Sequence, residues 1–243
     1  ITPLYGVIGL TSILLEDKSL KDHETDLKSL KFSADYLLAL INDVLQMNKM
    51  ESNLVKLENL PLNLKDLLES IVKSFEFTRL QNKNNIHLII DPAIPFNLIG
   101  DPVRLSQVLM NLVGNAMKFT ERGNIWIKVG LAGTKEGTAQ ILFSIKDDGL
   151  GIPRNKQTII FEEFSQLKSA NYNYQGTGLG LPIVKKLLAL FNSEISLESE
   201  EGVGSEFSFE IEFKTDASIQ EEIIQDIREI ETSFTIAGGM EKT

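Results

Sequence analysis

Two glycine-rich loops between residues 147 and 181 constrain this chain more than any other feature. The first, DDGLGI at 147–152, follows a strand-like run, and the second, GTGLGL at 176–181, leads into a helical pattern at 182–191. Glycine lets backbone N–H groups approach a ligand closely, and a loop that feeds a helix N-terminus binds anions. Asp147 adds a fixed hydrogen-bond acceptor, which suits an exocyclic amine better than a phosphate. The pair therefore predicts a ligand with an amine at one end and phosphates at the other, a purine nucleotide.

Either loop alone is equally typical of an ordinary turn between a strand and a helix. Neither contains the P-loop pattern GxxxxGK[ST], and neither has the dinucleotide pattern GxGxxG with an acid downstream. The interpretation as a nucleotide site therefore depends on the two loops together with the segments that precede them.

Composition limits the class of protein. A chain of 243 residues with 42% hydrophobic residues can form one large domain or two modest ones. It has no cysteine, which excludes disulfides and thiolate metal sites and fits a cytoplasmic location. No apolar run reaches the ~18 residues of a membrane span, and no signal peptide is visible. The net charge of −10 argues against nucleic acid as a partner, because phosphate contacts need clustered Lys and Arg.

Residues 1–54 predict a helical hairpin. Apolar residues at helical spacing occupy 4–14, residues 19–22 have the composition of a turn, and the second helix carries a seam with alternating spacings of three and four. The seam comprises Leu27, Leu30, Ala34, Leu37, Ile41, Val44 and Asn48. A dimer that forms a four-helix bundle would bury this stripe. The alternative is a hairpin that packs on the second domain of its own chain.

Residues 55–215 alternate strand-like and helical patterns, which predict an α/β domain. Strands are expected at 55–60, ended by Pro61, and at 86–91, with a helix at 64–75 and a polar loop at 81–85 between them. Asp101 and Pro102 are typical of a helix cap and first turn. Later strands are expected at 124–131 and 138–145, joined by a turn at Gly133 and Gly137, and at 194–199 and 206–213, joined by Gly202-x-Gly204.

The helix that starts after Asp101 carries Asn111, Asn115 and Lys118. Spacings of four and three place these side chains on one face. Two amides and an ammonium can hold a magnesium–phosphate assembly, since Mg²⁺ prefers oxygen ligands and shares substrate phosphates. The alternative is a solvated polar stripe.

Residues 165–175 are polar and lack a hydrophobic period. We interpret them as a lid over the nucleotide, hinged at Phe164 and Gly176, because lids exclude water on closing. An ordinary surface loop is the competing interpretation.

Five motifs in a fixed order now resemble the catalytic core of bacterial sensor histidine kinases of the two-component or hybrid type. The resemblance covers residues 1–214. The segments are the asparagine box QxxxNxxxNAxKFT at 107–120, the glycine boxes DxGxGI at 147–152, GTGLGL at 176–181 and GxGSxF at 202–207, and the phenylalanine box FxxF at 161–164. An ordered set of five is far more specific than any one motif.

The resemblance implies an α+β protein: a helical hairpin that forms a homodimeric four-helix bundle, then an ATP-binding α/β sandwich whose mixed sheet is covered on one face by helices. It implies that Asp147 bonds the adenine amine, Asn115 ligates Mg²⁺, Lys118 reaches phosphate as the catalytic cation, and the backbone near Gly178 and Gly180 cradles phosphates. The γ-phosphoryl group would pass to a hairpin histidine and then to an aspartate on a response-regulator receiver domain. The ATP-binding residues implied are Asn111, Asn115, Lys118, Asp147, Gly149, Gly151, Ile152, Phe164, Gly176, Thr177, Gly178, Leu179, Gly180 and Leu181.

The chain departs from the family pattern in several places. Thr2-Pro3-Leu4 resembles the end of the histidine box, so the acceptor histidine is expected upstream of Ile1, and neither His23 nor His87 has its context. We therefore expect these 243 residues to bind ATP without phosphorylating themselves. Thr2 matches a position that helps dephosphorylate the regulator in some relatives. Gln175 stands where a glycine is usual and the lid lacks its usual basic residue, which would alter nucleotide affinity or lid closure.

Residues 216–243 carry seven acids and two basic residues, with Ile219, Ile223, Ile227 and Ile230 on one helical face. The segment suits a linker helix or one that packs on the kinase core.

Two rival functions stay open. The first is an ATPase of the gyrase, chaperone or mismatch-repair class, which normally lacks the heptad hairpin. The second is a non-catalytic dimeric scaffold that only senses nucleotide.

Overall fold

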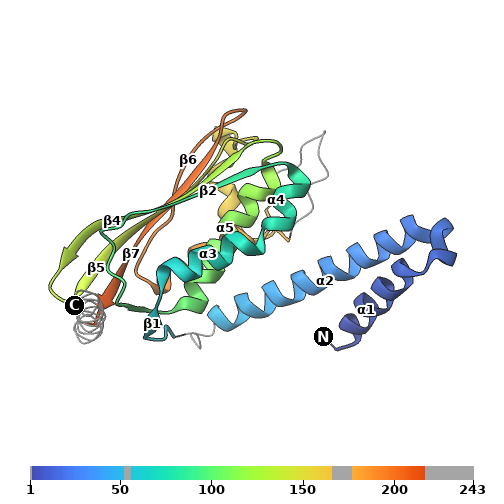
Figure 1. The fold of residues 1–243 in the computed structure, drawn as a ribbon, viewed down its shortest axis with the longest axis horizontal. Helices are drawn as coiled ribbons and strands as arrows, with labels where there is room; N and C mark the ends of the chain where they lie inside the picture. Colours follow the sequence, from blue (N-terminus) through green and yellow to red (C-terminus); the bar gives the residue numbers. More distant parts are fainter. Residues whose placement is uncertain (1, 52–55, 166–176, 217–243) are drawn as a thin grey trace, which may run out of the picture. The chain divides into compact units, whose positions relative to one another are not determined.

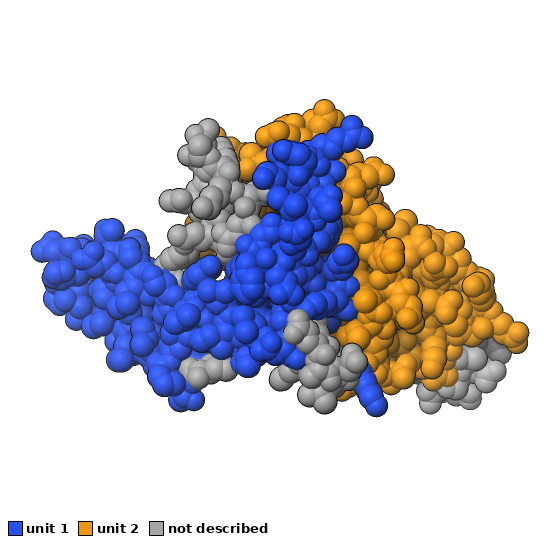
Figure 2. Space-filling view, turned by 180° about the vertical axis from the view of Figure 1, so that it is seen from behind, with its two compact units in different colours: residues 1–56, 153–187 blue, residues 57–152, 188–243 orange. Residues whose placement is uncertain are grey.

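The computed structural model describes residues 2–51, 56–165 and 177–216. The chain separates into two compact units, residues 1–56 with 153–187 and residues 57–152 with 188–243, which Figure 2 colours separately. The expected lid, apart from Ser165, and the tail beyond Asp216 lie outside the described residues.

The first unit contains the expected hairpin. Helix α1 spans Thr2–Glu16 and helix α2 spans Glu24–Glu51, and the short 3₁₀ helix η1, Lys18–His23, connects them (Figure 1). Asp17 caps η1, since its Oδ1 accepts a hydrogen bond of 2.8 Å from the Ser19 N–H. The connection predicted at 19–22 is therefore confirmed in place, although it is helical.

The seam of α2 divides into two lines of apolar residues. Ala34 is buried and Leu27 and Ile41 are half-buried, as expected for residues that face α1. Leu30, Leu37 and Val44, also seven residues apart, remain 50%, 48% and 38% exposed. The hairpin thus covers only one of the two lines.

The second unit is built on a seven-stranded mixed sheet with the order β1-β3-β7-β5-β4-β2, in which β6 also pairs with β7. The pair β2–β4 is parallel and the other pairs are antiparallel. The strands are β1 Leu60–Leu62, β2 Asn85–Ile90, β3 Leu98–Gly100, β4 Asn124–Lys135, β5 Thr138–Asp147, β6 Ser196–Glu200 and β7 Gly204–Thr215.

One face of the sheet forms the core. Helices α3 (Leu64–Ser74), α4 (Glu76–Asn82) and α5 (Pro102–Phe119) lie on that face (Figure 1). Alternate residues of the central strands point into it, and Phe143 stacks on Phe209 with ring centroids 4.9 Å apart. The apolar face of α5, which includes Leu105, Leu109 and Leu112, is fully buried. The predicted α+β architecture with a mixed sheet is confirmed.

The predicted start of α5 is also confirmed. Pro102 occupies its first turn, and Asp101 Oδ1 accepts a hydrogen bond of 2.9 Å from the Arg104 N–H. The second oxygen, Oδ2, accepts one of 3.0 Å from the Glu58 N–H, so this buried carboxylate also ties down the segment that precedes β1.

Three local predictions were wrong, and one short strand was missed. Pro61 does not end a strand at 55–60 but lies inside β1, which is an edge strand where the missing N–H of proline costs little. The chain continues from α3 into a second helix, α4, whose last residues fall in the predicted polar loop, and the short strand β3 was not predicted. Gly133 is not in the turn but at a register shift within β4.

No helix in the described ranges has both the length and the apolar character needed to cross a bilayer.

Candidate nucleotide-binding site

The first glycine loop begins at a buried carboxylate. Asp147 is the last residue of β5, is only 6% exposed, and pairs in register with Ser205 of β7. Its Oδ1 accepts a hydrogen bond of 3.0 Å from the Gly149 N–H, and the Ser205 N–H donates a second bond to the carboxylate. Burial raises the pKa of Asp147 to about 6, and the charge of Asp148 adds to this, while the two amide donors lower it.

Tight packing of the glycines fixes the path of this loop. A Cβ on Gly149 would collide with the Phe119 carbonyl oxygen at the end of α5, and one on Gly151 would collide with the Glu200 carbonyl. Gly151 also has a φ of +64°, which side chains other than glycine rarely adopt. The Leu150 N–H donates to the same Phe119 oxygen over 3.2 Å. The loop is therefore attached to the C-terminal end of α5.

Further hydrogen bonds hold the loop from its other side. The Ile152 N–H donates to Ser199 Oγ over 2.8 Å, and Ser199 Oγ lies 2.9 Å from Ser205 Oγ. The sequence analysis did not select Ser199 or Ser205 as site residues. Ser205 directly follows Gly204, so the third glycine motif was a signal for this segment, although the pairing of Ser205 with Asp147 is visible only in the fold.

Helix α5 carries the predicted polar face. Asn111 Nδ2 donates to the Gln107 carbonyl over 2.9 Å, so part of this amide is engaged within the helix. Asn115 lies one turn nearer the glycine loop, and its side chain forms no hydrogen bond with any described residue. Lys118 Nζ lies 4.9 Å from the Phe119 ring centroid, and burial lowers the pKa of this ammonium. The structure thus brings the glycine loop and the end of the polar face together.

The second glycine loop lies in the first unit, where it leads into α6, Gly180–Leu190. Gly178 has a φ of +73°, and its carbonyl accepts a bond of 3.1 Å from the Phe164 N–H, so the phenylalanine box and this loop adjoin. The Leu179 N–H donates to Thr177 Oγ1 over 3.2 Å. Leu181 lies in the first turn of α6, and Gly176 is outside the described residues.

The residues fit a magnesium nucleotide on chemical grounds. A buried acceptor at a strand end suits an exocyclic amine, and the amide of Asn115 offers the oxygen ligand that Mg²⁺ prefers. In the described ranges there is no cluster of three or more His, Asp or Glu residues that could hold a metal ion. A metal at this site would therefore take its remaining ligands from phosphate and water.

Fold and motifs together define a nucleotide-binding domain of the type that kinases and ATPases share. The family model described as histidine kinase-, DNA gyrase B- and HSP90-like ATPase matches residues 100–215, and the model for the His Kinase A phospho-acceptor domain matches residues 2–53. The two matched segments together make up well over half of the chain. The chain belongs to the histidine kinases, of which it contains the hairpin and the ATPase domain.

Sequences similar to this chain include sensor kinases. The chain is 39% identical over 219 residues to the signal transduction histidine-protein kinase BarA of Escherichia coli (strain K12), which covers 90% of this chain and 24% of the relative. It is 37% identical over 208 residues to the sensor histidine kinase GacS of Pseudomonas protegens, which covers 85% of this chain and 23% of that protein. This chain therefore spans about a quarter of the length of these relatives.

Among solved structures, full-length ShkA in complex with AMPPNP has a TM-score of 0.72 and 31% identity, and the match covers 88% of this chain and 44% of that one. The same fold recurs in the histidine kinase AdeS of Acinetobacter baumannii, at 22% identity and a TM-score of 0.59.

Replacement of Asp147 by Asn should change how the stability of the ligand-free protein depends on pH. Because the folded pKa of about 6 exceeds the unfolded value of ~3.9, the folded state binds more protons between these values. The contribution of Asp147 to stability is then greatest below pH ~4 and falls by roughly 3 kcal/mol as pH rises through 6. Asp147→Asn should lose this slope and be more stable than the parent at pH 7.

Urea unfolding between pH 4 and 7, followed through Trp126, the single tryptophan, measures the effect within this domain. Asp148→Asn is the matched control and should keep most of the slope, because Asp148 is exposed, its carboxylate accepts bonds from the N–H and Nδ2 of Asn124, and its charge raises the pKa of Asp147 less than burial does. Parallel pH profiles for the parent and Asp147→Asn would contradict the assignment.

Proposed function

We propose that this chain binds Mg-ATP and serves as the catalytic core of a sensor kinase in two-component signalling. The γ-phosphoryl group passes to a histidine on a hairpin and then to an aspartate on a response-regulator receiver domain. Transfer breaks the bond between the γ-phosphorus and the bridging oxygen and forms a P–N bond on the imidazole, with ADP as the leaving group. The lability of that bond suits a relay.

The observation that carries the proposal is the attachment of the Asp147 loop to the end of α5. Asp147 accepts a hydrogen bond from the adenine amine, while Asn115 and Lys118 lie one turn apart at the same end of the helix. Lys118 faces phosphate, and its partial burial strengthens that interaction. Mg²⁺ would supply charge neutralisation, with Asn115 as its protein ligand.

The second glycine loop supplies the phosphate cradle. Its backbone N–H groups precede α6, where the helix dipole favours anions, and Phe164 is bonded to it through the Gly178 carbonyl. Preorganised amides of this kind stabilise charge that develops during transfer. ShkA, which is similar to this chain over 88% of its length, is in complex with AMPPNP, and this supports nucleotide binding here.

Two copies of the hairpin associate in the proposed assembly. The line formed by Leu30, Leu37 and Val44 is apolar, regular and exposed in the single chain. A heptad stripe of this kind is buried when two hairpins form a four-helix bundle. Thr2, at the exposed start of α1, stays a candidate for the dephosphorylation position.

Replacement of Asn115 by Ala should weaken nucleotide binding only when magnesium is present. Loss of one metal ligand should raise the Kd for Mg-ATP roughly tenfold, equivalent to ~1.4 kcal/mol, and leave the Kd in EDTA nearly unchanged. Calorimetric titration with AMPPNP measures both values. The control Asn85→Ala removes an exposed amide at the start of β2 and should bind normally.

Unchanged magnesium dependence in Asn115→Ala would favour the non-catalytic scaffold. Sustained ATP hydrolysis without any receiver protein would favour the gyrase-like ATPase.

Replacement of Leu37 by Lys should dissociate the proposed dimer, because it buries a charge at a central seam position. We expect the dimer dissociation constant of the 243-residue chain to rise at least tenfold. Ala39→Lys adds the same charge to an exposed site 200° around α2 and should leave the dimer intact. Sedimentation equilibrium measures both variants, and equal effects would exclude the seam as the interface.

Neither histidine of this chain should accept the phosphoryl group. His23 is exposed in η1 near Asp26, and His87 lies on the exposed side of β2, stacked on Trp126 and 3.0 Å from Asn124 Oδ1. Incubation with γ-labelled ATP should give no more acid-labile phosphate than the double variant His23→Asn, His87→Asn. Label on either imidazole would contradict this assignment.

A further inference from the structure

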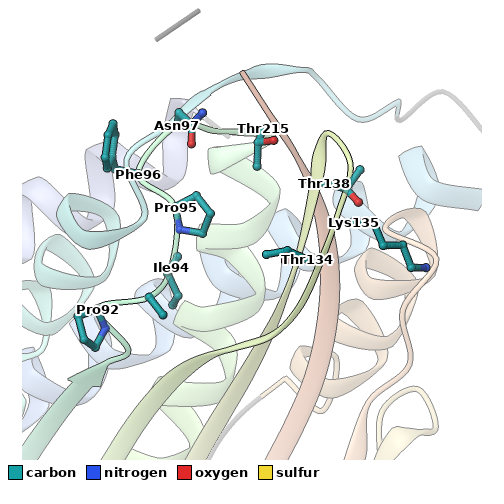
Figure 3. A pocket seen from close by; sticks show the side chains of 10 residues that line it. Pro92, Ile94, Pro95, Phe96, Asn97, Thr134, Lys135, Thr138 and Thr215 are labelled. Atoms are coloured by element: carbon teal, nitrogen blue, oxygen red, sulfur yellow. The ribbon is translucent and has the colours of Figure 1, made fainter. Parts of the chain in front are cut away.

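A cavity of about 370 Å³ lies far from the nucleotide-binding residues of the same unit. Its walls are the loop 92–97 between β2 and β3 and the hairpin that joins β4 to β5 (Figure 3). Strand β5 runs from Thr138 at this cavity to Asp147 at the glycine loop, a separation of ~30 Å at ~3.4 Å per residue. The cavity is therefore a separate feature of the domain.

The loop side of the cavity is apolar and partly uncovered, whereas the rest of the lining is polar and comprises Asn97, Thr134, Lys135, Thr138 and Thr215. Pro92, Ile94 and Pro95 contribute to the loop wall, and the adjacent Phe96 is 57% exposed. A segment that covered this ring and the apolar loop beside it would remove apolar surface from water, which is favourable.

The chain leaves the sheet at this rim. Thr215, the last residue of β7, lines the cavity. The Asp216 N–H donates to the Asn97 carbonyl over 3.0 Å, and Asn97 Nδ2 donates to the Asp216 carbonyl. Asn97 is 4% exposed, so the point from which residue 217 departs is firmly held beside the loop wall.

The sequence that follows Asp216 carries an apolar stripe that is close enough to reach the cavity. Ile219, Ile223, Ile227 and Ile230 recur at helical spacing among acidic residues. Ile219 comes three residues after Asp216, which limits their separation to ~10 Å. A short amphipathic helix is marginal in water and gains most of its stability from a surface that covers its apolar face.

We propose that residues 219–230 dock their isoleucine face on this cavity and cover Phe96. The other face then presents Glu221 and Glu222 to solvent. Lys135 on the cavity wall and Lys214 of β7 attract the acidic segment, although Glu136 and Glu212 at the same end offset part of this. Burial of apolar surface is therefore the main stabilising contribution, and the site is independent of nucleotide binding.

Disulfide trapping tests the docking directly, because the chain has no cysteine of its own. In the 243-residue protein, the pair Phe96→Cys, Ile223→Cys should form an intramolecular disulfide under mild oxidation. The matched pair Phe96→Cys, Glu221→Cys has nearly the same tether but places the thiol on the opposite helix face. We expect the first pair to close at least tenfold faster on a non-reducing gel.

Equal closure rates would mean that the tether alone brings the thiols together, and would overturn the proposal. Disulfides formed only between two chains would also overturn it, in favour of a second copy as occupant.

Amide hydrogen exchange of the loop 92–97 gives a readout without introduced thiols. Ile223→Ser should speed exchange in this loop roughly tenfold, whereas Glu221→Ser should leave it unchanged. Identical exchange in the two variants would contradict the docking even if the proteins are equally well folded.

Discussion

The buried carboxylate of Asp147 is the interaction on which the nucleotide end of this domain depends. It closes β5, receives amide bonds from Gly149 and Ser205, and so holds the first glycine loop against β7. Hydrogen bonds from two amides stabilise the ionised form of this buried carboxylate. They do not fully compensate for the loss of water, so its pKa stays above the ordinary value. A ligand amine that donates to Asp147 would offset the remaining cost of desolvating the carboxylate. The burial that destabilises the ligand-free domain would therefore favour the complex.

Other side chains extend this arrangement to neighbouring elements. Asn84 is fully buried and bonds both the Thr120 carbonyl and the Gly123 N–H, while Asp148 bonds the main chain of Asn124. The end of α5, the start of β4 and the first glycine loop are therefore connected through side-chain bonds to backbone. A buried side chain bonded at both ends, as Asn84 is, favours one geometry, because a shift would leave a donor or acceptor unpaired. This end of the domain is thus held together without a ligand.

The sequence predicted the parts of this structure that depend on local patterns. The heptads of α2, the Asp101-Pro102 start of α5 and the central strands all follow from periodicity or capping, which act within a few residues. The failures involve long-range pairing. Strand β3 and the edge strand that contains Pro61 exist because they pair with each other, and nothing in three residues signals that. Ser205 belongs to the site only because β7 lies in register beside β5, which spacing along the chain does not reveal.

The nucleotide domain alone does not decide between a kinase and an ATPase, since one family description covers both. The discriminating element is the hairpin, which has its own match to a phospho-acceptor domain. Its seam carries one line of apolar residues that the single chain covers and a second that it leaves in water. A stripe kept regular over three heptads without a partner would cost solubility and return no stability. An ATPase that acts alone has no need of such a stripe. A kinase must present an acceptor helix to its nucleotide domain, and burying the stripe between two hairpins gives a rigid bundle that holds this helix.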